Sequence, residues 1–227
     1  MINANLLATL EAGLTEMGLE EIWVDQQEKL IAYLLLIHKW NKVHNLTAVR
    51  DPLEMVTLHL LDSLSVLLYI QKADMSEAKY LLDVGAGAGL PSIPLAICMP
   101  ELQVTAIDSV QKKASFMRQA KGELGLSNFH VEAGRVEDLK CEHQFDVIIS
   151  RAFSEISLFI KLTKHLLAVN GQWLAMKGVQ PTAELDAFKA LNLDIQVTRI
   201  LPLHVTGLQA ERHLIFLHPP VLQNNNL

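Results

Sequence analysis

The chain has 227 residues, of which 50% are hydrophobic, and a formal net charge of −6 at pH 7. A chain of this length forms one domain of ordinary size, or one domain with an extension, around an ample core. The two cysteines, Cys98 and Cys141, are far apart and form no C-x-x-C arrangement. This pattern excludes a disulfide framework and a zinc site, and it indicates a reducing compartment.

The N-terminus lacks a basic region followed by an apolar core, so it does not resemble a signal peptide. Asp62, Pro94 or Pro100 interrupts each of the most apolar segments, and we expect none to reach membrane-spanning length. We therefore expect a cytoplasmic protein with no membrane partner. We also expect a monomer without a bound metal.

The net charge argues against a nucleic-acid partner, but the charges are unevenly distributed. Three stretches contain basic residues and no acidic residue, namely 29–50, 109–122 and 161–177. These stretches could form one basic face in an otherwise acidic protein. They could equally be ordinary solvated helix surfaces, and charge alone does not decide between the two interpretations.

The N-terminal part of the chain is predicted to be helical. Residues 5–18 form a first helix, and Asp25 with Glu28 predicts a capping box at the start of a second. Apolar residues recur at helical spacing along this second helix, at Leu30, Tyr33, Leu34, Ile37 and Trp40. This spacing favours a core position for Trp40 over a base-stacking role.

A third helix is predicted to begin at Asp51, because Pro52 suits the first helical position and Glu54 completes a capping box. Its apolar positions are Leu58, Leu61, Leu64, Leu67 and Leu68. Residues 1–70 are therefore expected to form a helical extension, and residues 71–227 a second region packed with it as one globular unit.

From residue 80 onward, strands and helices are predicted to alternate. The predicted strands lie near 80–84, 103–107, 128–132, 145–150, 171–176, 194–200 and 212–218. The predicted helices lie near 91–98, 111–124, 155–167 and 181–190. Such alternation predicts a parallel sheet with helices on both faces. The last two strands have no helix-length segment between them, so we expect them to be antiparallel.

A glycine-rich turn follows the first predicted strand. Gly85, Gly87 and Gly89 occupy alternate positions, which lets the backbone turn sharply and a ligand approach the main chain closely. Asp108 follows Gly89 by 19 residues and ends the next apolar run. A nucleotide-binding βαβ unit places an acid for ribose hydroxyls at this position.

The turn differs from the dinucleotide fingerprint, which would require glycine at position 90, where this chain has Leu90. Asp83 precedes the glycines, and its carboxylate would repel a pyrophosphate but attract a cation. S-adenosylmethionine (SAM) fits both features, because it has a ribose, an adenine and a cationic ammonium but no phosphate. The alternative is a plain strand-to-helix turn in another α/β protein.

Seven strands with an antiparallel last strand are the layout of the SAM-dependent methyltransferase fold, a Rossmann-like α/β architecture. Ligands of such sheets bind at the carboxyl ends of the strands. The residues at these ends are Gly85 to Leu90, Asp108 with Ser109, Ala133 to Glu137, Ser150 to Phe153, and Lys177 with Gly178. We expect them to converge on one site.

The residues at the strand ends restrict the methyl acceptor. The slot Ser150-Arg151-Ala152-Phe153 lacks the Asn/Asp-Pro-Pro-aromatic motif that is typical of exocyclic amine methylation. Carbon-5 pyrimidine methylation needs a cysteine nucleophile, and neither Cys98 nor Cys141 is well placed. A hydroxyl acceptor would need a base or a metal. A ring nitrogen such as guanine N7 has a free lone pair and needs neither, although this argument only permits that acceptor.

The motifs together resemble the bacterial small-subunit ribosomal RNA guanine-N7 methyltransferases, historically called glucose-inhibited division protein B. The resemblance covers nearly the whole chain, with Ala88 where proline is usual and Ser92 where glycine is usual. It rests on His38-Lys39-Trp40-Asn41-Lys42, Asn45-Leu46-Thr47, Asp83 to Pro91, Asp108-Ser109, Phe116-x-Arg118, Arg135-Val136-Glu137, Ser150-Arg151-Ala152, Lys177-Gly178 and Glu211-Arg212-His213.

The resemblance implies methyl transfer from SAM to N7 of one guanine in the 530 loop of 16S ribosomal RNA, presented as RNA or as a small ribosomal subunit. It also implies that Asp108 holds the ribose, that Val136 and Glu137 flank the adenine, and that Arg151 is catalytic beside the acceptor. The predicted cofactor contacts are Asp83, Gly85, Gly87, Gly89, Leu90, Asp108, Val136, Glu137 and Arg151.

Several of these residues also have a purely structural interpretation. Asp108 could cap the following helix, and Arg135 could simply pair with Glu137. The position of Arg151 favours a functional role, because an unpaired arginine at the carboxyl edge of a sheet faces the pocket. Glu211-Arg212 is interpreted as a structural pair.

Six residues are predicted to contact RNA: His38, Lys42, Asn45, Lys112, Arg118 and Lys177. The basic side chains would bind phosphates, while the alternatives are solvation or hydrogen bonds inside the helical extension. Two rival functions remain open. One is a small-molecule methyltransferase, and the other is a non-enzymatic module that binds RNA or a partner.

Overall fold

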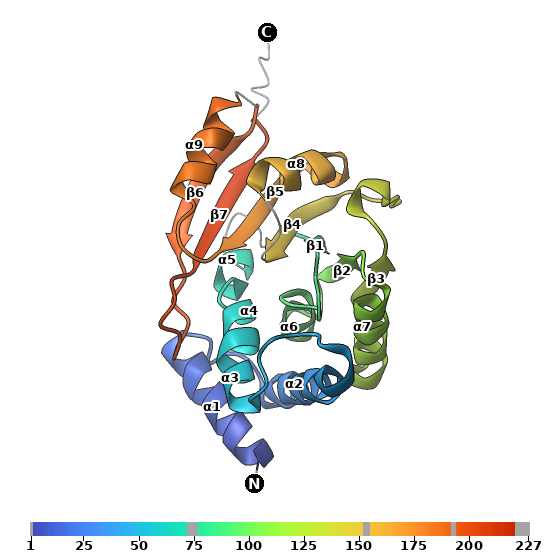
Figure 1. Cartoon of the computed structure of the whole chain (residues 1–227), viewed down its shortest axis with the longest axis vertical. Helices are drawn as coiled ribbons and strands as arrows, with labels where there is room; N and C mark the ends of the chain where they lie inside the picture. Colours follow the sequence, from blue (N-terminus) through green and yellow to red (C-terminus); the bar gives the residue numbers. More distant parts are fainter. Residues whose placement is uncertain (1, 72–76, 152–154, 192–193, 221–227) are drawn as a thin grey trace.

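The computed structural model describes residues 2–71, 77–151, 155–191 and 194–220. Its centre is a seven-stranded sheet with the strand order β3-β2-β1-β4-β5-β7-β6 (Figure 1). The strands are β1 Tyr80–Val84, β2 Gln103–Asp108, β3 Phe129–Ala133, β4 Phe145–Arg151, β5 Leu167–Lys177, β6 Gln196–Pro202 and β7 His213–His218. Neighbouring strands from β3 to β5 are parallel, and β7 is antiparallel to both β5 and β6. The predicted sheet is confirmed.

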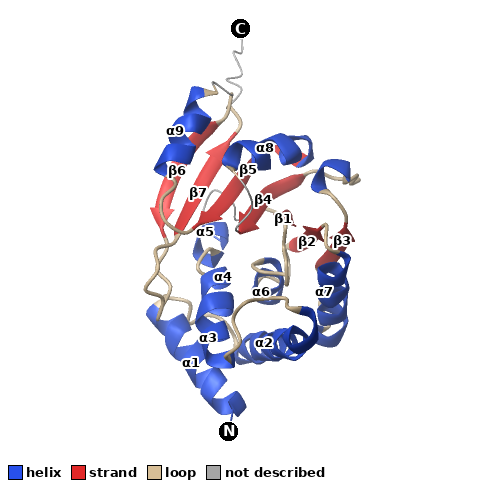
Figure 2. Ribbon diagram, viewed as in Figure 1, coloured by secondary structure: helices blue, strands red, loops and turns tan. Residues whose placement is uncertain are grey.

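Helices cover both faces of the sheet, with α1 to α7 on one side and α8 and α9 on the other (Figure 2). The helices are α1 Ile2–Glu16, α2 Val24–His44, α3 Pro52–Met55, α4 Asp62–Leu64, α5 Leu67–Gln71, α6 Ser92–Cys98, α7 Gln111–Leu124, α8 Ile156–Thr163 and α9 Thr182–Ala190. A π-helical turn, Val56–Leu61, joins α3 to α4. Ala152 and Phe153 of the predicted slot after β4 lie outside the described residues.

The N-terminal helices share one hydrophobic core with the sheet. Leu34 of α2 and Leu81 of β1 are both completely buried in this core. The ring of Phe116 on α7 lies 6.4 Å from that of Tyr33 and 5.4 Å from that of Trp40. The core position predicted for Trp40 is confirmed, although part of the ring stays exposed.

The predicted capping box at the second helix is wrong. Helix α2 begins at Val24, before Asp25, and the side chain of Gln26 accepts a hydrogen bond of 2.9 Å from the backbone N–H of Trp23. The sequence pattern misplaced the helix start because Gln26 serves as the capping residue that we assigned to Glu28. By contrast, the Asp51 cap is confirmed, since its carboxylate accepts from Leu53 N–H at 3.0 Å.

The third helical segment continues through Asp62, as its apolar positions predict, and it reaches a membrane-spanning length, contrary to our expectation. Pro52–Gln71 forms a helical run of 20 residues that by length and composition alone could cross a membrane. However, 67% of its most apolar window is buried inside the fold, which makes it a core helix of this structure. The helix accommodates Asp62 because both carboxylate oxygens are paired with arginines.

The three stretches without acidic residues do not come from one layer. Helix α2 packs against α7, so the stretches 29–50 and 109–122 adjoin each other. Helix α8, which carries Lys161 of the third stretch, packs on the opposite face of the sheet.

Candidate active site

The glycine turn after β1 has the backbone conformation that its sequence predicts. Gly85, Gly87 and Gly89 have φ angles of 71°, 62° and 86°, a region that side chains disfavour. A Cβ on Gly89 would also lie 2.5 Å from a side-chain carbon of Ile93. Helix α2 helps to hold the turn in place, because the hydroxyl of Tyr33 donates a hydrogen bond of 2.6 Å to the carbonyl of Ala88.

Asp83 lies beneath the glycine turn and is fully buried. One carboxylate oxygen accepts from Ser92 N–H at 3.2 Å, while the other has no hydrogen-bond partner among the described residues. Burial raises the pKa of this carboxyl from 3.8 to about 6. The structure therefore places Asp83 as a support under the turn, and its predicted contact with the cofactor remains a prediction.

Asp108 connects the glycine turn to the segment that leads into α7. One of its oxygens accepts from Gly87 N–H at 2.9 Å, and the other accepts from Val110 N–H at 2.8 Å. The ammonium of Lys113 lies 3.7 Å from the first oxygen. Because α7 begins only at Gln111, Asp108 is not its N-cap, which corrects that alternative.

A pocket of about 470 Å³ opens at the carboxyl ends of β1, β2 and β3. It brings together four of the predicted cofactor residues, Gly85, Asp108, Val136 and Glu137. Gly87, Gly89 and Leu90 lie in the adjoining turn and do not line this pocket. Glu137 pairs with Arg135 at 2.6 Å on an exposed surface, so the structural interpretation of that pair is confirmed.

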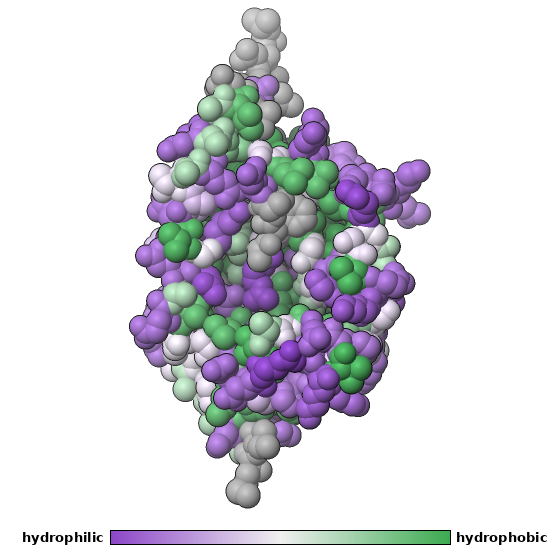
Figure 3. Space-filling model, in the orientation of Figure 1, coloured by the Kyte–Doolittle hydropathy of each residue, from purple (hydrophilic) through white to green (hydrophobic). Residues whose placement is uncertain are grey.

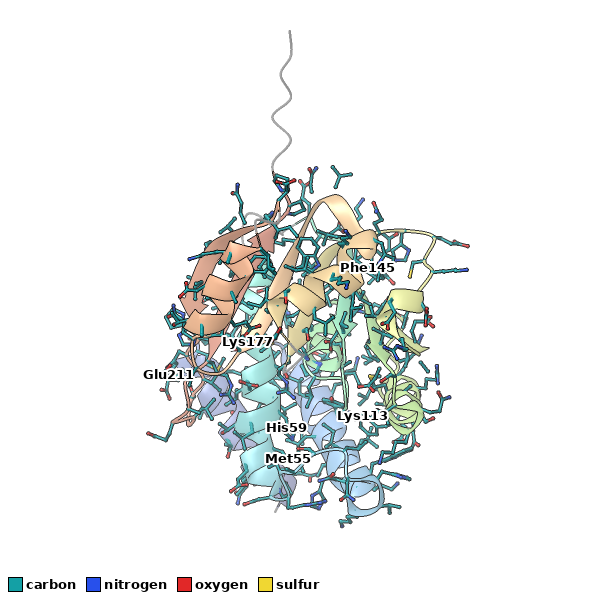
Figure 4. All side chains as sticks on the ribbon, turned by 45° about the horizontal axis from the view of Figure 1, so that its top comes forward. Met55, His59, Lys113, Phe145, Lys177 and Glu211 are labelled. Carbon is teal, nitrogen blue, oxygen red and sulfur yellow. The ribbon has the colours of Figure 1, made fainter. Side chains whose placement is uncertain are left out.

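A second pocket of about 470 Å³ lies at the ends of β4 and β5 and the start of β7. It contains the predicted residues Arg151 and Lys177. The π-helical turn and α4 form its other side through Leu58, His59 and Asp62. Figure 4 labels His59 on this helical run and Lys177 at the end of β5. In Figure 3, hydrophilic side chains occupy the hollow between the sheet and the N-terminal helices.

Arg151 is not unpaired, which corrects the interpretation based on its strand-end position. Its guanidinium donates to Asp62 at 2.9 Å and to the carbonyl of Leu58 at 3.3 Å. Arg212 donates to the other Asp62 oxygen at 2.7 Å. Arg212 also donates to the backbone carbonyl of Glu211 at 2.9 Å, so the two residues are in contact, but the ion pair of Arg212 is with Asp62.

The predicted RNA contacts are distributed over several elements. His38 and Lys42 lie on α2, Lys112 and Arg118 are exposed on α7, and Lys177 pairs with Glu184. Asn45 ends α2 in the left-handed conformation and accepts from Arg50 at 2.8 Å. Hydrogen bonds inside the extension are confirmed for the neighbouring Asn41, which is buried and bonds to Thr47 and Val49.

The structure offers no cysteine nucleophile at either pocket. Cys98 is buried in α6, and burial raises the pKa of its thiol to about 12, so it stays protonated. Cys141 is exposed in the loop that precedes β4 and lines neither pocket. Across the described ranges, no three His, Cys, Asp or Glu side chains gather into a group that could hold a metal ion.

The family model for rRNA small subunit methyltransferase G matches residues 26–215 of this chain. The chain belongs to this family. It is 59% identical over 208 residues to the Ribosomal RNA small subunit methyltransferase G of Methylobacillus flagellatus, covering 92% of this chain and 96% of that protein. Its identity to the protein of the same name from Aromatoleum aromaticum is 50%, covering 92% and 97%.

Solved structures support the methyltransferase fold at much lower identity. The mitomycin 7-O-methyltransferase MmcR aligns with a TM-score of 0.60 and 15% identity, covering 82% of this chain and 60% of that one. The glycopeptide N-methyltransferase MtfA in complex with SAM aligns with a TM-score of 0.56 and 10% identity, covering 72% and 96%. This member of the methyltransferase G family is a SAM-dependent methyltransferase.

The first pocket fits SAM on its own geometry. Its volume lies in the range of roughly 300–1,000 Å³ that is usual for small-molecule sites. Val110, Val136 and Leu162 offer apolar surface for an adenine, and the Asp108 carboxylate is an acceptor for ribose hydroxyls. Gly85 lines the pocket and has no Cβ, so a ligand can approach its backbone closely.

Sequence reasoning missed three residues of this family member's site. Tyr33 was expected only as a core residue, and its hydroxyl contact could not be foreseen from helical spacing. Asp62 was interpreted only as an interruption of an apolar segment, and His59 was not considered. A charged residue within a long apolar helical pattern was the available signal, because such a charge needs a buried partner.

Proposed function

We propose that the enzyme transfers the methyl group of SAM to N7 of a guanine in the 530 loop of 16S ribosomal RNA, with SAM in the first pocket and the guanine in the second. The observation that carries this proposal is the position of the two pockets. They lie on the two sides of the point where the strand order reverses, between β1 and β4. Ligands of doubly wound sheets meet at this switch point.

SAM supplies a methyl group that is activated by a sulfonium charge. In the reaction, the N7 lone pair forms the new N–C bond as the C–S bond breaks, and no proton leaves the base. The enzyme therefore needs to orient the guanine and exclude water rather than remove a proton. The proposed mechanism accordingly assigns no residue as a general base.

The second pocket has side chains suited to a guanine. Arg151, Arg212 and Lys177 present N–H donors around it, and guanine offers O6 as an acceptor next to N7. His59 is buried, and burial lowers the pKa of its imidazole, so the ring is neutral at pH 7. Adenine presents its N6 amine, a donor, at the position where guanine presents O6. The N–H donors of the pocket would therefore meet no acceptor at that position.

The RNA backbone would be held outside the two pockets. Lys42 of α2 and Lys112 and Arg118 of α7 are exposed on adjoining helices. Such residues bind phosphates without reading sequence and make binding sensitive to salt. The substrate would be 16S ribosomal RNA or a small ribosomal subunit in the cytoplasm, bound by a monomer of the enzyme.

The test is methyl transfer from labelled SAM to small subunits from cells that lack this enzyme, followed by cleavage mapping of 7-methylguanine. One modified guanine in the 530 loop is the expected result. Transfer to another nucleotide would overturn the assignment of the target. No transfer to subunits or to their extracted RNA, by protein shown to bind SAM, would instead favour a small-molecule acceptor.

A further inference from the structure

Asp62 is the one carboxylate among the described residues that line the second pocket. Its side chain is 3% exposed, and its two oxygens bind different arginines, Arg151 at 2.9 Å and Arg212 at 2.7 Å. Arg151 ends β4 and Arg212 directly precedes β7, and β5 lies between these two strands in the sheet. Asp62 therefore holds together two side chains from segments that are not neighbours in the sheet.

The helix that carries Asp62 is irregular at the same place. The π-helical turn Val56–Leu61 ends directly before Asp62, and the carbonyl of Leu58 in this turn accepts a second bond from Arg151. Such turns occur often at functional sites, because they shift the side chains that follow. The irregular turn thus supplies one acceptor for the Arg151 guanidinium, the Leu58 carbonyl, and the residue directly after the turn, Asp62, supplies the other.

An independent observation indicates that the pocket takes a ligand. His59 lines it and is only 5% exposed, yet its ring Nδ1 has no hydrogen-bond partner among the described residues. Its other nitrogen, Nε2, is bonded to the hydroxyl of Thr47 at 2.9 Å. A buried polar atom without a partner is costly, so a polar ligand that reaches Nδ1 would remove this cost.

We propose that Asp62 is a positioning residue for methyl transfer, because it aligns Arg151 and Arg212 as a wall of donors for O6 of the target guanine. This inference rests on the proposed function. With O6 bound by the wall, N7 is free to face the methyl group. Asp62 acts through the arginines and does not itself contact the reacting atoms.

The arginines need Asp62 for their alignment because their two positively charged guanidinium groups repel each other. A carboxylate between them offsets this repulsion and orients both planar groups by charge-assisted hydrogen bonds. It also neutralises one of the two positive charges, which matters because the base becomes positive as N7 is methylated. Without the carboxylate, the arginines would separate, and a displacement of about 1 Å can reduce a rate by about 100-fold.

The test compares Asp62→Asn with Asp51→Asn, which removes a carboxylate from the start of the same helical run. Asn remains a good N-cap at position 51, so this control should match the wild type. For Asp62→Asn, we expect kcat on small subunits to fall about 100-fold, while SAM affinity in equilibrium binding changes less than about twofold. The two values separate a role at the acceptor from a role at the cofactor.

A second readout tests O6 recognition directly. Small subunits are reconstituted with 2-aminopurine, which keeps N7 but lacks O6, in place of the target guanine. The wild type and Asp51→Asn should methylate the guanine subunits at least about tenfold faster, and Asp62→Asn should lose most of this preference. A purely structural role of Asp62 would lower both rates equally and leave the preference unchanged.

Several outcomes would overturn the inference. A parallel loss of SAM affinity in Asp62→Asn would place the arginines at the cofactor, and an unchanged preference would exclude O6 recognition. If Asp62→Asn does not fold, Arg212→Lys keeps the charge but loses the planar guanidinium, and it should weaken the same preference. Failure of the wild type to methylate the 530-loop guanine would reject the proposed function itself and is seen before any variant is measured.

Discussion

The two pockets are built in different ways, although they have similar volumes. The first is formed by turns that directly follow β1, β2 and β3, and its main polar contact joins Asp108 to Gly87, 21 residues apart. In the second, Asp62 contacts Arg151 and Arg212, which are 89 and 150 residues away. The first pocket therefore depends on local backbone geometry, and the second depends on ion pairs between distant segments.

This difference indicates how each pocket responds to substitution. A backbone turn with positive φ angles is encoded by a few glycines and tolerates change around it. An ion-pair network requires three elements to be in place at once, and removing Asp62 would leave both arginines without this partner. Substitutions in the first pocket should thus affect SAM binding, while substitutions in the second should affect methyl transfer.

The largest expected effect is that of Gly85→Asp. Gly85 lines the first pocket with φ 71°, so the new side chain would be strained and would occupy space meant for the cofactor. SAM binding and methyl transfer should fall below detection in equilibrium binding and transfer assays. Gly18→Asp is the matched control, because Gly18 also has φ 71° and has open space around it. Normal SAM binding by Gly85→Asp would show that the pocket is misassigned.

Arg151→Ala should follow, with a loss of roughly 100- to 1,000-fold in kcat. The change removes the donor from β4 and leaves Asp62 paired with Arg212 alone. Single-turnover methylation of small subunits measures this loss, and circular dichroism tests whether the fold survives. A variant that kept its kcat and lost only SAM affinity would move Arg151 from the acceptor pocket to the cofactor pocket.

Asp83→Asn should change the pH dependence of stability. The folded state raises the pKa of Asp83 from 3.8 to about 6, so the folded protein binds this proton more tightly than the unfolded chain. The free energy of unfolding therefore falls as the pH rises from about 4 to about 6, by about 3 kcal/mol in total. An asparagine at this position cannot ionise, so the free energy of unfolding of the variant does not fall over this pH range. Thermal unfolding at pH 7.5 should therefore show that Asp83→Asn is more stable than the wild type. Lower stability than the wild type at pH 7.5 would contradict this prediction.

The smallest effect is expected for Lys112→Ala, which removes one exposed cation from α7. Binding to small subunits should weaken by a few fold, and the slope of log affinity against log salt should decrease by about one. SAM affinity should stay the same, which separates this residue from Lys113 at the rim of the first pocket. An unchanged salt slope would mean that Lys112 is simply solvated.

Much of the first pocket could be predicted because its signals are close together in the sequence. The glycine spacing and the acid after β2 identified Gly85 and Asp108, and the alternation of strands and helices placed them at one sheet edge. The prediction was incomplete for Asp83, whose carboxylate is buried under the turn. Residue spacing shows which strand carries an acid but not how deeply the next helix buries it.

The sequence by itself determined the alternation of strands and helices along the chain and the residues of the glycine turn, because these follow from local periodicity and from glycine's access to positive φ angles. Only the tertiary structure decided the partners of Asp62, Arg151 and Arg212. Charged groups pair across space, and the energy that selects a partner depends on burial and distance rather than on sequence separation. The second pocket is therefore a product of folding, made when a buried carboxylate on a core helix meets the arginine that ends β4 and the arginine that precedes β7.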